Sequence, residues 1–371
     1  MGKIDELIKQ MCPEGVKWVK LKDIGTNLDR KRKPITASNR IPGEIPYYGA
    51  SGIVDYVKDY LFDGDYLLIS EDGANLLSRT YRIAFSIHGK TWVNNHAHII
   101  EFKDRSTRKY VEHYLNSLDL TPWIAAGAQP KLTQDSLNSI EIPLPPLPIQ
   151  EAIVEILDKF DRLSAELQAE LQARKTQYEY YRNQLLTRFA PDQQVKEYSL
   201  GELCNLNRGR RLVKEQLSQT EGYPVYQNCV TPLGYHSESN CLAGTTIVIG
   251  AGAAGDIAFV NEAFWAADDC YYFTCPDYVI NKYIYYALCD KQNLLKSRVR
   301  KASIPRLART EIEKIKILVP SLSEQARIVS ILDKFEALVN DLSQGLPAEI
   351  EAVKEQYEYY RNKLLTFDKI S

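Results

Sequence analysis

The sequence of 371 residues lacks a long apolar run, a paired cysteine motif and a strong net charge. No apolar run reaches 18 residues, so we expect no transmembrane helix. The first residues, MGKIDELIKQMCPEG, contain acidic side chains and no apolar core segment, unlike a signal peptide. The seven cysteines form no CxxC pair, which favours free thiols in a reducing cytoplasm over a zinc site. A net charge of −2 argues against a whole surface that coats nucleic acid, although local basic patches remain compatible with it.

Catalytic motifs are also absent from the sequence. We find no Walker A, HExxH or GxSxG motif, no proline-proline-aromatic loop of the methyltransferase type and no carboxylate–lysine cluster of the nuclease type. GAGAAG at Gly250–Gly255 matches GxGxxG, but a dinucleotide site requires a helix directly after it. The next residues, DIAFVNEAF, alternate as a strand does, which favours a glycine-rich hairpin. We therefore expect a non-catalytic chain that binds no cofactor itself.

The clearest positive feature is an internal repeat. QYEYYRNQLL at Gln177–Leu186 recurs as QYEYYRNKLL at Gln356–Leu365, with nine of ten positions identical at an offset of 179. ILDKF at Ile156–Phe160 recurs at Ile331–Phe335 with an offset of 175. A self-match of this kind indicates that the chain is built from two related halves.

Both repeated stretches read as long helices. Apolar residues recur in alternating steps of four and three, which is typical of a coiled-coil seam, and two such helices most simply pack antiparallel on each other. The first helix is expected to start at the proline-rich segment ending in Pro148, and the second after Pro320 with Ser321 or Ser323 as its cap. Gly345–Pro347 predicts a kink or short break in the second helix. The repeated tyrosines are expected to pack in the core: Tyr178, Tyr181, Tyr357 and Tyr360.

Each long helix follows one globular module. VKWVKLKDI at Val16–Ile24 resembles VKEYSLGEL at Val195–Leu203, and Gln129–Leu132 resembles Ile304–Leu307. The predicted organisation is an N-terminal helical segment (1–15), a first module (16–146), a central helix (147–190), a second module (195–320) and a C-terminal helix (321–371). The modules read as mixed α/β (α+β). Strands are predicted at Tyr66–Ser70, Arg82–Ser86, His98–Phe102, Thr245–Ile249, Ile257–Val260 and Cys270–Thr274, and helices at Lys3–Met11, Lys109–Leu118 and Asn281–Cys289.

Two locations are basic in both halves, which favours contact with phosphates over the ordinary alternative of a solvated charged face. The first lies near the start of each module and comprises Arg30, Lys31, Arg32 and Lys33 in one half and Arg208, Arg210, Arg211 and Lys214 in the other. The second lies before each long helix and comprises Gln129 and Lys131 in one half and Arg298, Arg300, Lys301, Ser303, Arg306 and Arg309 in the other.

Two polar stretches, SEDGAN at Ser70–Asn75 and WVNNHAH at Trp92–His98, are dense in hydrogen-bonding side chains. Amides can read adenine edges and basic side chains can read guanine, although polar turns with local hydrogen bonds would look the same. His96 and His98 with Asp72 could suggest a metal site, but no further ligand set is visible. The candidate DNA-contacting residues outside the basic clusters are Tyr48, Ser51, Glu71, Asp72, Asn75, Asn94, Asn95, His96 and Asn228.

This architecture resembles the specificity (S) subunit of type I restriction–modification enzymes. The resemblance covers the whole chain and is carried most specifically by the two ILDKF helices and by the junctions IPLPPLPIQEAIVEILDKF and ILVPSLSEQARIVSILDKF. It implies two target-recognition domains, each reading one half of a bipartite DNA site. The first helix departs from an exact repeat, because it lacks the Gly-Leu-Pro break of the second.

The resemblance also implies partners. The helices would separate the modules and bind two methyltransferase (M) subunits, while motor–nuclease (R) subunits would join for ATP-dependent cleavage of DNA. S-adenosylmethionine, ATP and Mg²⁺ would be bound by those partners in the cytoplasm, and not by this chain. Two alternatives remain. One is a coiled-coil adaptor whose modules bind protein, and the other is an enzyme that uses the GAGAAG loop.

Overall fold

The computed structural model describes residues 2–125, 129–340 and 345–370, and the chain forms two compact units. Unit 1 consists of Met1–Glu166 together with Ile350–Ser371, and unit 2 consists of Leu167–Glu349. Each unit holds one globular module and stretches of two long helices. Unit 1 therefore combines segments from both ends of the chain.

The module of unit 1 is built on a six-stranded sheet in the order β2-β7-β5-β6-β3-β4. Neighbouring strands are antiparallel except β3 and β6, which are parallel. A separate antiparallel pair, β1 with β10, joins the start of the module to its end. The strands are β1 (Lys17–Lys20), β2 (Gly25–Asn27), β3 (Pro42–Gly49), β4 (Gly52–Val57), β5 (Phe62–Ser70), β6 (Ala84–Val93), β7 (Ala97–Phe102), β8 (Ile124–Ala125), β9 (Lys131–Leu132) and β10 (Glu141–Leu144).

Helix α4 (Arg105–Ser117) packs on this sheet. It begins where Asp104 accepts a hydrogen bond from the Thr107 amide at 2.7 Å, a side-chain cap that satisfies one of the free N–H groups of the first turn. The predicted helix Lys109–Leu118 is confirmed but starts four residues earlier. The other helices of the module are α1 (Gly2–Met11), α2 (Leu21–Ile24), α3 (Asn75–Ser78) and α5 (Gln134–Ser139), with 3-10 turns at Asp29–Lys31, Ala37–Asn39 and Thr121–Trp123.

The module of unit 2 repeats this plan with smaller sheets. A four-stranded antiparallel sheet has the order β12-β18-β15-β16, and a three-stranded sheet has the order β14-β13-β17 with β13 and β17 parallel. The pair β11–β19 matches β1–β10 of unit 1. The elements are β11 (Lys196–Ser199), α7 (Leu200–Leu203), β12 (Asn205–Arg208), a 3-10 turn (Lys214–Gln216), β13 (Tyr223–Tyr226), β14 (Gly234–His236), β15 (Thr245–Ile249), β16 (Ile257–Val260), β17 (Trp265–Ala266), β18 (Cys270–Thr274), α8 (Asn281–Asp290), α9 (Gln292–Ser297), α10 (Arg309–Glu313) and β19 (Lys316–Val319).

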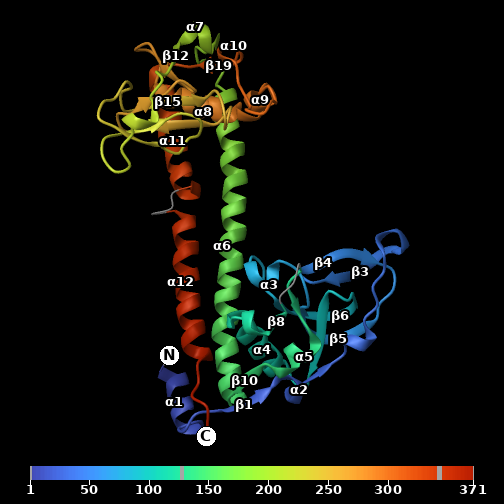
Figure 1. Ribbon diagram of the computed structural model, residues 1–371. Coiled ribbons are helices and arrows are strands. Elements are labelled where there is room, and N and C mark those ends of the chain that lie inside the picture. Colours follow the sequence, from blue (N-terminus) through green and yellow to red (C-terminus); the bar gives the residue numbers. More distant parts are fainter. Residues whose placement is uncertain (1, 126–128, 341–344, 371) are drawn as a thin grey trace. The chain divides into compact units, whose positions relative to one another are not determined.

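The long helices are α6 (Leu147–Thr187), α11 (Leu322–Asn340) and α12 (Leu346–Leu365), and within each unit two of these stretches run antiparallel (Figure 1). In unit 1, the Phe160 ring lies 5.6 Å from that of Tyr360. In unit 2, the Phe335 ring lies 5.8 Å from that of Tyr181. The phenylalanine of one repeat thus meets a tyrosine of the other in both units. These contacts explain why both patterns recur in the sequence.

The predicted helix starts are confirmed. Pro148 lies in the first turn of α6, and the Ser321 hydroxyl accepts a hydrogen bond from the Glu324 amide at 3.4 Å at the start of α11. The predicted interruption is also confirmed, because Gly345 forms a bend directly before α12 begins at Leu346. Residues 341–344 lie outside the described residues. The coiled-coil geometry itself stays a prediction.

A buried glutamine fixes each long helix to the linker before it. Gln150 donates to the Pro145 carbonyl at 2.7 Å, and Gln325 donates to the Pro320 carbonyl at 2.9 Å. These two glutamines occupy equivalent positions in the repeat, and both side chains are buried. A buried polar group costs free energy unless it is paired, so each bond stabilises the contact between the start of the helix and the linker before it.

The N-terminal helix docks beside the end of the chain. Ile4 of α1 belongs to the same buried cluster as Leu364 and Leu365 of α12. The Val16 amide donates to the Asp368 carbonyl at 2.9 Å, and the Ile370 amide donates to the Val16 carbonyl at 3.1 Å. Helix α1 and the segment that follows α12 therefore lie side by side in unit 1 (Figure 1).

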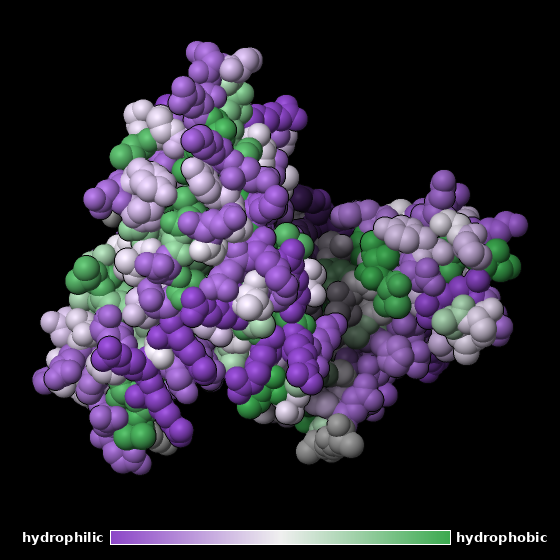
Figure 2. All heavy atoms as spheres, turned by 90° about the horizontal axis from the view of Figure 1, so that it is seen from above, coloured by the Kyte–Doolittle hydropathy of each residue, from purple (hydrophilic) through white to green (hydrophobic). Residues whose placement is uncertain are grey.

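Hydrophilic residues dominate the face shown in Figure 2, and hydrophobic residues occur on it in small groups. Among the helices of the described segments, none combines the length and the apolar character that crossing a membrane requires. All seven cysteines are free thiols.

Candidate nucleic-acid interface

The junction before each long helix occupies the same place in both modules. The Lys131 backbone forms an isolated β-bridge with Asp72 after β5, and the Arg306 backbone forms one with Ala251 after β15. The Leu132 amide donates to the Glu71 carbonyl at 2.8 Å, as the Leu307 amide does to the Gly250 carbonyl at 2.8 Å. The correspondence predicted from Gln129–Leu132 and Ile304–Leu307 is therefore present in three dimensions, and it places one exposed cation beside the loop after each central strand.

A tryptophan connects the other basic segment of each module to the same region. The Trp92 indole N–H donates to the Lys33 carbonyl at 2.6 Å, and the Trp265 indole N–H donates to the Arg210 carbonyl at 3.0 Å. Buried or half-buried indole groups require such an acceptor. The basic segment near the start of each module is thereby held next to the turn that follows the tryptophan.

In unit 1 these loops surround a cleft of about 650 Å³. Its lining includes six of the residues that the sequence singles out, namely Ser51, Asp72, Asn75, Asn94, Asn95 and His96. Asn75 is already engaged, because its amide donates to the Tyr81 carbonyl at 3.0 Å and accepts from the Tyr81 amide at 2.8 Å. Asn94 is buried, and its side-chain oxygen accepts from the His96 amide at 2.8 Å.

His96 is oriented by a carboxylate. Its Nδ1 lies 2.9 Å from the nearer Asp72 oxygen, and about half of its side chain is exposed. Because a carboxylate only accepts, Nδ1 carries a proton and Nε2 is left for another partner. Asn95 is exposed, and among the described residues its side chain has no hydrogen-bond partner.

Arg32 turns inward from the first basic cluster. It donates to Glu71 at 2.5 Å and to the Ala97 carbonyl at 2.7 Å, and it also pairs with Asp29. Burial on its own would raise the pKa of Glu71, but the hydrogen bond and charge of Arg32, with His98 and Lys131, lower it. Arg32 and Glu71 therefore hold the module together. Their contact with DNA stays a prediction that this geometry does not favour.

The histidines of WVNNHAH do not form the metal site that was considered. His98 is buried, and its ring nitrogens lie 2.6 Å from an Asp29 oxygen and 2.8 Å from the Leu132 carbonyl, away from the Asp72 that holds His96. Two other groups in the described part of the chain bring three ligand atoms within 4.8 Å, Asp29–Glu71–His98 and His113–Asp158–Asp161. In the first, the Arg32 guanidinium already supplies the positive charge that a metal would bring.

In unit 2 the matching loops surround a cleft of about 310 Å³ that is rich in arginine. Arg208, Arg298, Arg300 and Arg306 all line it. Arg208 donates to the Asp268 carbonyl at 2.6 Å, Arg298 lies 3.5 Å from Glu311, and Arg306 lies 3.9 Å from Asp269. The Arg300 and Arg306 backbones pair with each other, which places both side chains on one short hairpin. Anions such as phosphates match this lining.

The glycine-rich segment forms the predicted hairpin. Gly250–Gly255 connects β15 to the antiparallel β16, and no helix follows it. Gly252 has a φ of +85°, and a side chain there would lie 2.8 Å from the Asn228 carbonyl. The segment is therefore a tight turn beside the arginine-rich cleft and does not have the strand–turn–helix build of a dinucleotide site.

The comparisons with known proteins decide the family. The model of the type I restriction modification DNA specificity domain matches residues 13–174 and again residues 192–352. A putative type I restriction enzyme specificity subunit from Haemophilus influenzae is 35% identical over 95% of this chain and 96% of its own length. The chain belongs to the type I restriction–modification specificity family. The alternative of an unrelated coiled-coil adaptor loses its support.

Two further specificity subunits are similar. One from Escherichia coli is 31% identical over 72% of this chain and 72% of its own length. The solved structure of a specificity subunit from M. genitalium covers 95% of this chain and 96% of its own, with a TM-score of 0.68 and 16% identity. At that identity the likeness supports the fold alone. It agrees with two repeated modules and long helices.

The remaining candidate residues of this specificity subunit lie mostly on the surface. Tyr48 is half-buried against Phe85, and burial raises its pKa. Arg309 pairs with Glu313 in α10. The side chain of Lys214 is not described. Exposed residues whose side chains have no partner within the described segments are Arg30, Lys31, Lys33, Gln129, Arg210, Arg211, Asn228, Arg300, Lys301 and Ser303.

Sequence reasoning missed Asp268 and Asp269, which line the cleft of unit 2. They follow Trp265 as Asn95 and His96 follow Trp92. The two tryptophans were the signal that could have aligned these turns, but the modules differ too much around them for the match to stand out.

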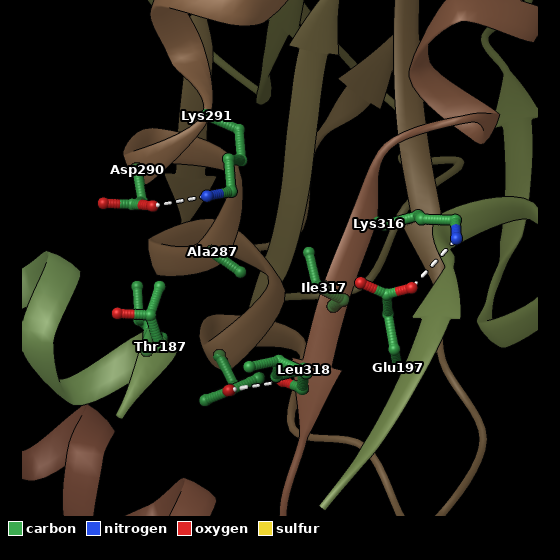
Figure 3. Close-up of a pocket in the computed structure, with 10 residues that line it drawn as sticks. Thr187, Glu197, Ala287, Asp290, Lys291, Lys316, Ile317 and Leu318 are labelled. Atoms are coloured by element: carbon green, nitrogen blue, oxygen red, sulfur yellow. Dashed lines mark hydrogen bonds and ion pairs between the residues drawn. The ribbon is translucent and has the colours of Figure 1, made fainter. Parts of the chain in front are cut away.

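The third cavity, of about 170 Å³, contains none of the candidate residues (Figure 3). It is lined by the end of α6, β11, α8 and β19 of unit 2, and ion pairs join Lys316 to Glu197 at 2.9 Å and Lys291 to Asp290 at 3.1 Å. Tyr283 donates to the Leu318 carbonyl at 2.7 Å beside it. This cavity lies where the module of unit 2 packs against the end of its long helix.

Proposed function

We propose that this specificity subunit recognises a bipartite DNA site, with each module reading one half. The observation that carries the proposal is the contrast between the two clefts. Matching loops on a repeated scaffold line both, but one presents amides and a histidine and the other presents arginines and aspartates. Two modules that recognise the same DNA sequence would need clefts with the same lining, whereas two modules that recognise different half-sites need clefts with different linings.

The exposed cations flanking each cleft would contact phosphates and set the position of the module on DNA. Lys131, Lys33 and Lys31 serve this role in unit 1, and Arg306, Arg300 and Arg210 serve it in unit 2. Such contacts supply affinity and register without sequence information, so sequence must be read by other side chains in the clefts.

The long helices would hold two methyltransferase subunits. Tyr180 and Tyr359 occupy equivalent positions in the repeat, and their side chains are 58% and 62% exposed. Large exposed aromatic side chains are enriched at protein interfaces, and a repeated pair offers the same contact to two copies of one partner. Motor–nuclease subunits would join this assembly for restriction.

The chain itself would be non-catalytic. S-adenosylmethionine, ATP and Mg²⁺ would be bound by the methyltransferase and motor–nuclease subunits. We place the assembly in the cytoplasm, where a reducing environment suits seven free thiols.

Co-expression of the chain with its methyltransferase subunits, followed by sequencing of methylated bases across the genome, tests this proposal. The expected result is methylation at one motif made of two short sequences separated by unspecified bases. Methylation without a bipartite motif, or none that depends on this chain, would overturn it. A protein adaptor would in addition show no steep fall of DNA binding with rising salt, which phosphate contacts produce.

A further inference from the structure

One turn is built identically in the two modules although its side chains differ. In unit 1 it is Asn94–His96, between β6 and β7, and in unit 2 it is Ala267–Asp269, between β17 and β18. The Asn94 amide donates to the Tyr48 carbonyl at 3.0 Å, and the Ala267 amide donates to the Tyr226 carbonyl at 2.8 Å. We call these segments the reading turns.

The far end of each reading turn is fixed in the same way. The Glu71 amide donates to the His96 carbonyl at 2.9 Å, and the Gly250 amide donates to the Asp269 carbonyl at 2.7 Å. The anchoring tryptophan precedes each turn by two residues. Backbone bonds at both ends hold the turns in place before any ligand arrives. Such rigid placement is what a discriminating hydrogen bond requires.

Both clefts are lined by their reading turn. In unit 1, hydrogen bonds within the protein occupy the Asn75 amide and the Asn94 oxygen, whereas Asn95 is exposed and has no partner among the described residues. In unit 2, the side chain of the equivalent Asp268 accepts one long hydrogen bond, at 3.5 Å from Gln227, and has no other partner in the described part of the chain. The middle residue of each turn thus has a side chain that is available to bind something else.

We propose that the reading turns are the base-reading elements of the two modules, with Asn95 selecting adenine and Asp268 selecting cytosine. A side-chain amide bonds adenine at N6 and N7 together, whereas a carboxylate only accepts and so favours the N4 amino group of cytosine. The inference rests on the proposed function and assigns the residues that distinguish its two half-sites.

The cations around each turn fit this assignment. The Lys131 backbone pairs with that of Asp72 while its Nζ lies 3.1 Å from Glu71, and the Arg306 side chain lies 3.9 Å from Asp269. Phosphate contacts by these cations would bring the duplex over the turn, where the middle residue meets a base edge. His96 presents Nε2 beside Asn95 and would contact the neighbouring base.

Reciprocal substitutions test the inference in the complete complex with methyltransferase subunits. The readout is the methylated motif in a library of randomised DNA. Asn95→Asp should change one adenine of the first half-site to cytosine, and Asp268→Asn should change one cytosine of the second half-site to adenine. Asn95→Ala should reduce the preference for that adenine about tenfold or more. Each variant should leave the other half-site unchanged.

Asn39→Asp is the matched control in unit 1, since it makes the same substitution at an exposed amide of the same module that does not line the cleft. Asp277→Asn, an exposed site in the same module, is the control for unit 2. Both should leave the motif unchanged. The inference is overturned if the Asn95 and Asp268 variants keep both half-sites. It is also overturned if they lose methylation of every sequence while unfolding at the wild-type temperature. A wild-type complex without a bipartite motif would instead refute the proposed function.

Discussion

Arg32 Nη1 lies 2.5 Å from Glu71 Oε2, and only about a tenth of each side chain is exposed. Arg30, two residues earlier, is exposed and has no side-chain partner in the described part of the chain. One cluster of basic residues thus contains a structural cation and a free one. The two arginines form a matched pair for experiment.

Arg32→Ala should destabilise the first module by about 3 kcal/mol, because it removes the guanidinium that pairs with the buried carboxylates of Glu71 and Asp29. Arg30→Ala should change stability by less than about 0.5 kcal/mol. Hydrogen exchange of the β7 amides measures the local free energy of opening, since the Ile99 amide donates to Asp29 at 3.0 Å. Equal effects of the two variants would contradict the internal role of Arg32.

The charge of Glu71 predicts a loss of stability in acid. Its folded pKa lies below the ordinary 4.5, so its contribution is complete above that value and is lost as pH falls through the folded pKa. Glu71→Gln should therefore lower the unfolding temperature of the first module at pH 7, and the difference from wild type should shrink below about pH 4.5. A difference that stays constant down to pH 3 would show that the charge is not responsible.

Arg306→Ala should weaken binding of the assembled complex to all DNA sequences alike. Loss of one phosphate contact should reduce the slope of log affinity against log salt by about 1. Fluorescence anisotropy over a salt series measures this slope. Lys314→Ala removes a cation of the same module that already pairs with Glu311 at 2.6 Å, and it should leave the slope unchanged. If both variants gave the wild-type slope, Arg306 would not meet a phosphate.

The length of α6 should set the spacer between the half-sites. SAEL at Ser164–Leu167 is followed by the near-repeat QAEL at Gln168–Leu171. One more such unit after Leu171 turns the helix by about 400° and adds roughly 6 Å, so an apolar residue stays close to the seam. Since DNA rises about 3.4 Å per base pair, the spacer should grow by one or two base pairs while both half-sites persist. Methylome sequencing of a strain with the insertion would refute this if the spacer were unchanged.

Local patterns predicted much of the fold. The strands Thr245–Ile249, Ile257–Val260 and Cys270–Thr274 were predicted with the bounds that the structure has. The strand predicted at Arg82–Ser86 instead begins at Ala84 and runs to Val93. It passes through Gly89, which has a φ of +69° and pairs with Gly64 of β5. Glycine is depleted in strands, and only the pairing with β5 shows that this strand continues through Gly89.

The site was less predictable, because partners distant in sequence decide which side chains are free. Arg32 pairs with Glu71, which is 39 residues away, and the Asn75 side chain is hydrogen-bonded to the backbone of Tyr81. Nothing around Arg32 distinguishes it from Arg30 or Lys31. The equivalence of Lys131 and Arg306 was visible because a short motif surrounds each of them. The equivalence of Asn95 and Asp268 was not visible in the sequence, because only the backbone hydrogen bonds of the two turns reveal it.

The first module needs the last residues of the chain. Leu364 and Leu365 belong to its buried cluster, and Val16 pairs with Lys369. During synthesis, the first 166 residues leave the ribosome long before these partners exist. The N-terminal module therefore completes its core after the second module has been made, which reverses the usual order of folding along a chain. A nascent chain that stops early would expose this unfinished core to proteases and chaperones.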